Sequence, residues 1–151
     1  YSIWSGDENN EIKEEIKFVF NKKENKNGEK IKIMLGTPAI KEGVSLLRVS
    51  QVHILEPYWN LSRLNQVIGR AVRFCSHKDL KKKDREVDIY IYIATHPKDK
   101  MTIDRYILEM AYSKNDIISK FEMALKQSAI DCKLNYHGNV YNKEEHIECV
   151  K

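Results

Sequence analysis

Apolar residues recur along the chain in two periods, one typical of helices and one typical of strands. Residues 9–20 space Ile12, Ile16 and Val19 along one helical face and carry acidic residues early, which predicts an amphipathic helix. Runs rich in β-branched and aromatic residues predict strands at residues 1–5, 31–35, 52–55 and 87–94. Helical stretches separate these runs, so the pattern predicts a mostly parallel sheet covered by helices.

The pattern also divides the chain. Residues 21–30 are polar and predict a surface loop, and Thr102 is a suitable N-cap for a helical stretch that reaches residue 130. A break near residues 113–115 is expected to split that stretch into two helices. We therefore predict a core over residues 1–100, a helical extension over 101–131, and a tail over 132–151 that is poorly ordered or docked elsewhere.

Composition narrows the class of protein. The 151 residues are 42% hydrophobic and 32% charged, an ordinary soluble globular profile. No apolar run approaches the roughly 20 residues of a membrane span, so no membrane partner is expected. There is no signal peptide, and a start at Tyr1 predicts a piece of a longer protein. The net charge of +4 permits nucleic-acid binding without requiring it.

Cysteines bear on the compartment and on metal binding. Three cysteines are too few and too scattered for a disulfide framework, which favours a reducing, intracellular location. The series Cys132, His137, His146 and Cys149 is a conceivable zinc site, but its first pair lacks the usual short spacing, so we expect no metal there.

Residues 61–73 carry the most informative pattern. On a helix, the apolar residues fall on one side, while four polar residues lie within roughly 80° on the other: Arg63, Gln66, Arg70 and Arg73. Asn60 is a suitable N-cap. A soluble helix face explains such a stripe equally well, yet Gly69 costs about 1 kcal/mol of helix propensity relative to alanine and so favours a close approach by another group. Arginine forks also suit phosphate oxygens.

The stretch Gln66-Val-Ile-Gly69-Arg70-Ala-Val-Arg73 resembles motif VI of superfamily 2 helicases. Upstream, residues 36–46 resemble motif V, and residues 52–60 resemble the strand and Trp-Asn turn that precede motif VI in remodeller-like enzymes. Residues 56–60 and 70–77 further resemble the helicases of large cytoplasmic DNA viruses, including the nucleoside triphosphatase I and early transcription factor ATPases. The resemblance implies the second, C-terminal RecA-like lobe: a three-layer α/β domain with a helical extension.

The resemblance also implies roles for individual residues. Arg70 and Arg73 would face the ATP phosphates, with Arg73 as the arginine finger, and Gln66 would orient a hydroxyl, phosphate or water nearby. Glu42, Gly43 and Gly69 would lie near the nucleotide, although Glu42-Gly43 taken alone is more typical of an ordinary loop turn. Thr37 and Ser45 would contact the nucleic-acid backbone.

No phosphate-binding loop of the pattern Gly-x-x-x-x-Gly-Lys-Ser/Thr occurs, so this chain alone is predicted not to bind or hydrolyse ATP. ATP and Mg²⁺ are expected in the intact parent. The partners implied are an N-terminal RecA-like lobe of the same chain, nucleic acid (with double-stranded DNA favoured), and RNA polymerase or other transcription proteins. The resemblance implies a cytoplasmic viral factory or virion as the location. Two alternatives remain open: a non-catalytic RecA-like module that docks a partner protein, and a nucleotide-binding α/β enzyme of another kind.

Overall fold

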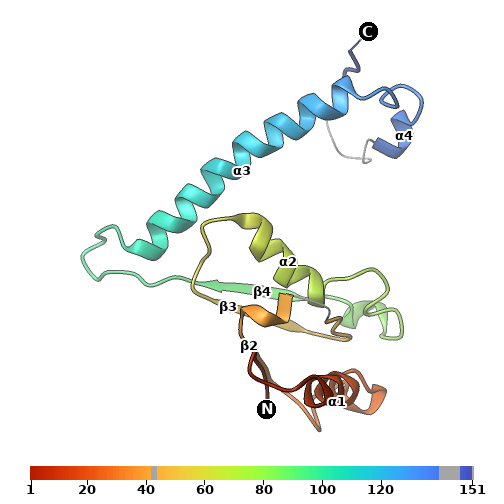
Figure 1. Ribbon diagram of the computed structural model, residues 1–151, viewed down its shortest axis with the longest axis vertical. Coiled ribbons are helices and arrows are strands. Elements are labelled where there is room, and N and C mark those ends of the chain that lie inside the picture. Colours follow the sequence, from red (N-terminus) through yellow and green to blue (C-terminus); the bar gives the residue numbers. More distant parts are fainter. Residues whose placement is uncertain (42–43, 140–146, 151) are drawn as a thin grey trace.

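The computed structural model describes residues 1–41, 44–139 and 147–150 (Figure 1). Within these ranges the strands are β1 (Ser2–Trp4), β2 (Met34–Gly36), β3 (Gln51–Leu55) and β4 (Asp88–Tyr92). The α-helices are α1 (Asn10–Phe20), α2 (Leu61–Ala71), α3 (Ile103–Ser128) and α4 (Tyr136–Asn139). Short 3₁₀ turns are η1 (Lys23–Asn25), η2 (Pro38–Lys41) and η3 (Lys82–Asp84).

The strands form two parallel pairs. β1 pairs with β2, with Ser2 opposite Met34, and β3 pairs with β4, with Gln51 opposite Asp88. The predicted α/β class and parallel pairing are confirmed. In the described part of the chain, however, the two pairs remain separate two-stranded sheets rather than one continuous sheet. Figure 1 shows α2 over the β3–β4 pair and α1 beside the β1–β2 pair.

The second predicted strand begins three residues later than its apolar pattern indicates, because Asn25 occupies the backbone ahead of it. The Asn25 side chain accepts from the N–H groups of Lys30 and Ile31 at 2.8 and 2.9 Å and donates to the Ile31 carbonyl at 3.0 Å. Asn25 thus bonds to both backbone groups of Ile31, which belong to no strand ladder in the described chain. Asn25 is itself buried, so the prediction of a simple polar surface loop over residues 21–30 is wrong at this position.

A small core joins the N-terminal elements. Trp4, Val44 and Leu46 are buried together, and Ile16 and Phe20 of α1 pack against them. Burial of such side chains contributes about 1.5–3 kcal/mol each, which outweighs the weak propensity of a short isolated helix. The core therefore fixes the segment after η2 against α1 and β1, the position on which the candidate site depends.

The end of β2 favours a glycine at residue 36. A Cβ added at Gly36 would lie 2.6 Å from Cδ1 of Ile40, because η2 folds back over the end of the strand. The Thr37 N–H also donates to the Trp4 carbonyl at 3.0 Å, which holds the start of this turn to β1.

The predicted break within the C-terminal helix is wrong. α3 runs without interruption from Ile103 to Ser128 and projects away from the strands (Figure 1). Serine and asparagine cost only a few tenths of a kcal/mol each inside a helix, so residues 113–115 weaken the helix without ending it. The Lys120–Asp116 ion pair, at 2.7 Å, supports the following turn.

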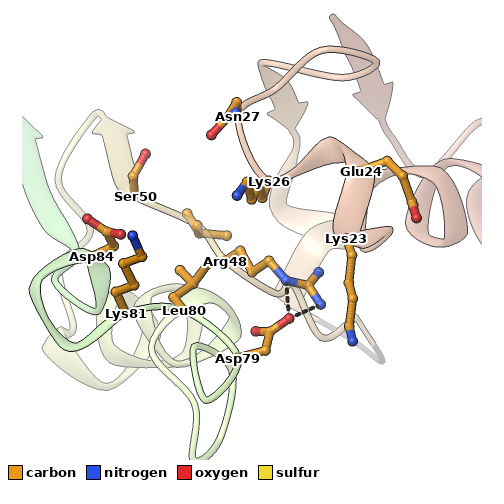
Figure 2. Close-up of a pocket in the computed structure, with 11 residues that line it drawn as sticks. Lys23, Glu24, Lys26, Asn27, Arg48, Ser50, Asp79, Leu80, Lys81 and Asp84 are labelled. Carbon is orange, nitrogen blue, oxygen red and sulfur yellow. Dashed lines mark hydrogen bonds and ion pairs between the residues drawn. The ribbon is translucent and has the colours of Figure 1, made fainter.

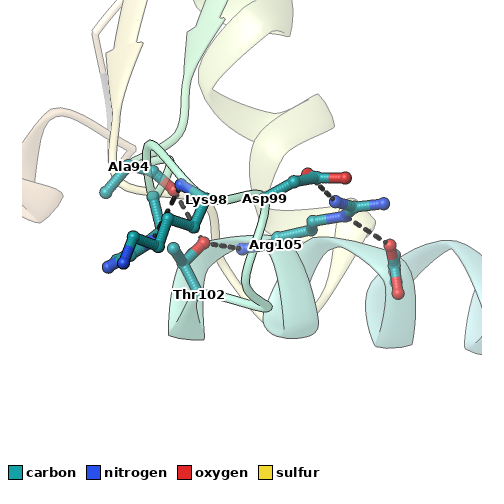
Figure 3. A network of polar contacts seen from close by, with 7 residues as sticks. Ala94, Lys98, Asp99, Thr102 and Arg105 are labelled. Carbon is teal, nitrogen blue, oxygen red and sulfur yellow. Dashed lines mark hydrogen bonds and ion pairs between the residues drawn. The ribbon is translucent and has the colours of Figure 1, made fainter.

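Polar contacts fix the start of α3 (Figure 3). The Thr102 hydroxyl donates to the Ala94 carbonyl at 2.7 Å and accepts from the Arg105 N–H at 3.3 Å, which confirms Thr102 as the N-cap. Arg105 bonds to Glu109 and Asp99, each at 3.0 Å, and these two carboxylates raise the pKa of its guanidinium. The connection between β4 and α3 is thereby held close to the strand.

The tail corrects the expectation drawn from the cysteines. Cys132 and Cys149 form a disulfide, and the Val150 N–H donates to the Gln127 carbonyl at 2.9 Å. The proposed zinc series loses both of its thiolates to this bond, while His146 lies outside the described residues. Sequence spacing gave no signal for this bond, because the approach of Cys132 to Cys149 is a tertiary feature.

No helix in the part of the chain that the structure describes is both long enough and apolar enough to cross a membrane.

Candidate functional site

The predicted arginine stripe divides at the end of α2. Gln66 is exposed on the helix and Arg70 is half-buried in its last turn. Arg73 lies beyond the last helical residue, Ala71, so the prediction of one helix over residues 61–73 is wrong at its C-terminal end. Arg63, at the other end, places its guanidinium carbon 3.8 Å from the centroid of the Tyr58 ring. Arg70 and Arg73 therefore lie at the C-terminal end of α2, Gln66 lies one turn before Arg70, and Arg63 contacts Tyr58 in the first turn.

Ser76 explains why α2 stops where it does. Its hydroxyl lies 3.2 Å from the Ala71 carbonyl and 2.7 Å from the Arg73 carbonyl, and it accepts from the Arg73 N–H at 3.3 Å. A buried serine thus supplies partners for the backbone groups that the helix end leaves unpaired. These hydrogen bonds accompany a turn of the backbone away from the axis of α2 at Arg73. They therefore fix the backbone position from which the Arg73 side chain extends.

The segment that resembles motif V lies against this helix end. Val44 and Leu46 point into the core, so the intervening Ser45 points outward. The Leu46 N–H donates to the Arg70 carbonyl at 3.1 Å, and Nη1 of Arg73 donates to the Ser45 hydroxyl. The alternation of buried and exposed residues therefore brings Ser45 together with Arg70 and Arg73.

Asn21 fixes the backbone of that segment from the other side. Its amide donates to the Ser45 carbonyl at 2.9 Å, and its carbonyl oxygen accepts from the Leu47 N–H at 2.8 Å. Both bonds span more than twenty residues of sequence. Asn21 closes α1 as its C-cap, so its position after an amphipathic helix was the only sequence signal for this role.

Arg48 is a second positioning residue that sequence reasoning missed (Figure 2). Its side chain is 8% exposed and bonds to Asp79 through Nε at 2.8 Å and Nη2 at 2.7 Å, while Nη1 donates to the Asn21 carbonyl at 2.7 Å. Its backbone N–H donates to the Ser76 carbonyl at 3.2 Å. Arg48 adopts φ of 60°, an uncommon conformation that these bonds hold in place.

The Arg48–Asp79 pair has an electrostatic consequence. The hydrogen bond from Arg48 lowers the pKa of the Asp79 carboxyl below its usual 3.8, against a smaller opposing effect of desolvation. Asp79 therefore stays ionised, and the pair links the segment after motif V to the loop after α2.

Other predicted residues lie apart from this group or outside the description. Thr37 is exposed, and its backbone N–H donates to the Trp4 carbonyl of β1. Glu42 and Gly43 lie outside the described residues. A Cβ added at Gly69 would have no neighbouring heavy atom within 4 Å, so packing within the described chain does not require a glycine there. Any group that approaches Gly69 must come from outside that part of the chain.

Two hollows flank the helix end. A pocket of about 510 Å³ is lined by Arg73 and its neighbours, which include Phe74, Ser76, His77 and Arg85. Another, of about 640 Å³, lies between η1 and the loop after α2 and contains the Arg48–Asp79 pair (Figure 2). The pocket of about 510 Å³ is lined by Arg73, a predicted catalytic residue, whereas the pocket of about 640 Å³ is lined by none. The smaller pocket is therefore the candidate site.

The two histidines near these elements are structural. His77 is buried, with Nδ1 2.7 Å from the Ser76 hydroxyl and Nε2 2.8 Å from the Val49 carbonyl. His53 on β3 stacks on Tyr90 and bonds to the Tyr92 hydroxyl at 2.8 Å. Their ring nitrogens are engaged within the chain, which agrees with the structural roles predicted from the sequence.

A family comparison decides which protein class this geometry belongs to. Residues 4–75, which include the last residue of β1 and all of β2, β3, α2 and the arginine-bearing helix end, match the helicase conserved C-terminal domain. Residues 4–75 are a helicase conserved C-terminal domain. The strands β2 and β3, the motif V segment and the end of α2 fall within this helicase domain, whereas β4 and most of β1 lie outside residues 4–75.

Relatives of the helicase domain occur in large DNA viruses. The chain is 56% identical over 149 residues to "Putative ATP-dependent RNA helicase R563" of Acanthamoeba polyphaga mimivirus, covering 99% of the chain and 26% of that protein. It is 38% identical over 125 residues to "Putative helicase 087L" of Invertebrate iridescent virus 3, covering 80% and 13%. It is 35% identical over 131 residues to "Termination factor NPH-I homolog" of African swine fever virus, covering 80% and 19%.

The resemblance to viral helicases is therefore confirmed, and the chain spans about a quarter or less of the length of these relatives.

Proposed function

We propose that this helicase domain supplies the arginine finger to an ATP-dependent, nucleic-acid-stimulated helicase or translocase. The observation that supports the proposal is the grouping of Arg70 and Arg73 at the end of α2, held by the Leu46 N–H bond and by the Ser76 cap. Positioned guanidinium groups are worth most when the backbone that carries them is fixed.

The chemistry asked of these residues is electrostatic. A phosphoryl group in transfer spreads negative charge over its oxygens, and a guanidinium that meets it is worth about 10³–10⁵ in rate in other enzymes. Arg73 is exposed and lines a pocket, so its fork is accessible to a phosphate once the Ser45 contact is exchanged. Gln66, exposed on the same helix, would orient a hydroxyl or water beside it.

The remaining parts of the nucleotide site would come from elsewhere. ATP and Mg²⁺ would bind mainly to an N-terminal RecA-like lobe of the same parent chain, since no phosphate-binding loop occurs among these 151 residues. Arg70 and Arg73 suit phosphate oxygens, and Glu42, Gly43 and Gly69 remain the proposed neighbours of the nucleotide. Among the residues that the structure describes, no cluster of three metal-ligating side chains offers a metal site.

Nucleic acid is the proposed polymer along which the enzyme acts, and Thr37 and Ser45 are the residues proposed to contact its backbone. Double-stranded DNA is favoured, because residues 56–60 resemble the remodeller-like turn, although one relative is named an RNA helicase and another a termination factor. A role in viral transcription, beside RNA polymerase in a viral factory or virion, follows from the same resemblance. Stimulation of ATP hydrolysis in the parent by duplex DNA, but not by RNA of equal length, is the expected result.

Arg73→Ala in the longer protein tests the finger directly. We expect ATP hydrolysis to fall by about 10³-fold or more while nucleotide affinity changes little, because the charge is needed mainly in the transition state. Steady-state hydrolysis and nucleotide titration measure the two quantities separately. The matched control is Arg105→Ala on α3, an exposed arginine away from the site, which should leave turnover unchanged. Normal turnover in Arg73→Ala would remove Arg73 from the site.

The isolated chain provides a second test. Half of a two-lobe nucleotide site is expected to give no nucleic-acid-stimulated ATP hydrolysis, because the phosphate-binding half is missing. Hydrolysis assays of residues 1–151, with and without duplex DNA, measure this. Turnover that survives further purification and is lost in Arg73→Ala would contradict the division of labour proposed between the two lobes.

A further inference from the structure

The larger of the two hollows is lined by basic side chains that the nucleotide site does not use. This pocket, of about 640 Å³, has η1 and the residues just after it on one side (Figure 2). The residues before β3 and the loop that contains η3 form the other side. Its lining includes Lys23, Lys26 and Lys81, which come from two basic segments of the sequence, residues 22–30 and 78–86.

These two segments account for the charge of the whole chain. Residues 22–30 hold four lysines and two glutamates, and residues 78–86 hold four lysines and one arginine against three acidic residues. Each segment therefore has an excess of two positive charges, and together they equal the net charge of +4 of all 151 residues. Taken separately, such runs are typical of solvated loops. The fold instead places them on opposite walls of one pocket.

Hydrogen bonds hold the backbone of both walls in place. On one wall, the Asn25 side chain bonds to backbone groups before and after the turn that carries Lys26. On the other, the Arg85 guanidinium donates to the carbonyls of Lys78 and Leu80 at 2.8 and 2.9 Å. The pocket lysines therefore extend from a fixed backbone, so binding of an anion requires little further ordering of the loops.

The arginine of this pocket is used within the chain, whereas its lysines are not. Nη2 of Arg48 lies 2.7 Å from the carboxylate of Asp79, so these two charges neutralise one another. Lys23, Lys26 and Lys81 form no ion pair with any residue that the structure describes. All three are exposed, and their ammonium groups are therefore available to an anion from outside.

The side chains around the hollow suit an anion. Figure 2 shows Lys26 and Asn27 on one side of it and Ser50 and Lys81 on the other. The Asn27 amide and the Ser50 hydroxyl add neutral hydrogen-bond donors to the two ammonium groups. The Asp84 carboxylate lies beside Lys81 in the same view, but the whole lining still holds four basic side chains against three acidic ones.

A phosphate backbone fits this surface better than a protein segment does. Protein interfaces are usually centred on aromatic or large apolar anchors, and the only apolar side chains in the lining are Val49 and Leu80. Ammonium groups with neutral donors beside them are the groups with which proteins contact phosphate oxygens, without reading the bases.

The pocket lies at the opposite end of the strands from Thr37. Its lining residues precede β2, β3 and β4, so they lie toward the amino ends of these parallel strands. Thr37 follows β2 and lies at its carboxyl end, where ligands of open α/β sheets usually bind. A polymer bound in the pocket would therefore meet the domain at a second place.

We propose that the pocket containing Lys23, Lys26 and Lys81 binds the phosphate backbone of nucleic acid at a place separate from the Thr37 contact. The proposal deepens the proposed function and rests on its nucleic-acid substrate. A contact of this kind adds affinity and salt dependence but no sequence preference.

The salt dependence of DNA binding by the longer protein tests the proposal. Affinity for a fluorescent duplex of about 30 base pairs is measured without ATP, between about 0.05 and about 0.2 M salt. Lys26→Ala/Lys81→Ala removes two phosphate contacts. The slope of log affinity against log salt should therefore become shallower by about 2, and affinity at the lowest salt should fall by about 10-fold or more.

Two matched variants separate the position of the charges from their number. Lys120→Ala/Lys126→Ala removes two exposed lysines from α3 and should leave the slope unchanged. Lys26→Arg/Lys81→Arg keeps the charge in the pocket and should retain the wild-type slope. All four lysines are exposed, so the thermal midpoints of the variants should equal that of the wild type.

Three results would overturn the proposal. An unchanged slope in Lys26→Ala/Lys81→Ala would show that the pocket does not contact the polymer. An equal change in the α3 control would reduce the effect to net charge. Loss of binding to a polyglutamate peptide, with duplex binding retained, would assign the pocket to an acidic protein instead.

Combination with Thr37→Ala tests whether the two contacts are separate. If Thr37→Ala weakens binding by itself, the fold-losses of independent contacts multiply in the combined variant. A combined loss no larger than the greater single loss would overturn the separate site. No effect of Thr37→Ala alone would remove Thr37 from the proposed contact without altering the lysine result. Because ATP is absent from these measurements, failure of the arginine finger is likewise distinguishable from failure of the pocket.

Discussion

Single side chains set the position of the candidate site more than the arginines themselves do. Asn21 bonds the backbone on both sides of Ser45. Ser76 bonds to the backbone at the end of α2 and at Arg73. Arg48 bonds to the Asn21 carbonyl and to Asp79, and so links the end of α1 to the loop after α2. None of the three carries the proposed chemistry, yet each holds a residue that does. At this scale the site is a set of long-range hydrogen bonds around two short segments.

Acid should weaken the Arg48–Asp79 pair. Because the folded-state pKa of Asp79 lies below the ordinary 3.8, the pair contributes fully above that pH, and its contribution is lost as the pH falls through the lowered folded-state pKa. Thermal midpoints measured from about pH 6 to about pH 2 should therefore fall further in the wild type than in Asp79→Asn. Parallel curves for the two proteins would show that the pair contributes no pH-dependent stability.

At the scale of elements, local sequence signals set the start of α2, and tertiary contacts bear on its end. Asn60 begins the helix, and its side chain accepts from the Ser62 N–H at 2.8 Å, as the sequence predicts. Leu64 and Ala71 are its buried residues and set the face that packs. The end of the helix is decided by Ser76, from outside the periodic stretch. Local pattern therefore predicted the beginning of α2 and misplaced its end.

The cap of α2 is expected to be worth about 1 kcal/mol. Asn60→Ala should lower the free energy of unfolding by about that amount, measured by chemical denaturation, because it leaves an N–H of the first turn without its side-chain partner. Asn65→Ala, an exposed position on the same helix, is the matched control and should be neutral or slightly stabilising. A loss in the control equal to that in Asn60→Ala would assign the effect to helix propensity rather than to capping.

At the scale of the whole molecule, the described elements form a small packed region and a long projecting helix. The core is limited to Trp4, Val44 and Leu46 with their neighbours, and much of α3 is exposed. The disulfide between Cys132 and Cys149 returns the end of the chain to the end of α3, where Ile147 is buried. Exposed apolar side chains lie on the β3–β4 pair and along α3, among them Leu55, Tyr92 and Phe121.

Loss of the disulfide should free the tail without changing the helicase domain. A crosslink across about 15 residues contributes about 3 kcal/mol by restricting the unfolded chain. In Cys149→Ser, limited proteolysis should cleave within residues 133–148 faster than in the wild type, and the strand pairs should be unaffected. Cys75→Ser, which removes the exposed free cysteine, is the control and should cleave at the wild-type rate. Unchanged cleavage in Cys149→Ser would mean that the disulfide does not hold the tail.

The sequence by itself determined the class of fold, and the residues of the site stay a prediction from it. Period-two and helical patterns are local, so they predicted the parallel strands and the caps at Asn60 and Thr102. The segments like motifs V and VI were identified by their resemblance to superfamily 2 helicases. Tertiary structure decided the exit of Arg73 from α2, the continuity of α3, the burial of Asn25 and the Cys132–Cys149 bond. Each of these depends on partners distant in sequence or on packing, and no periodic pattern records such partners.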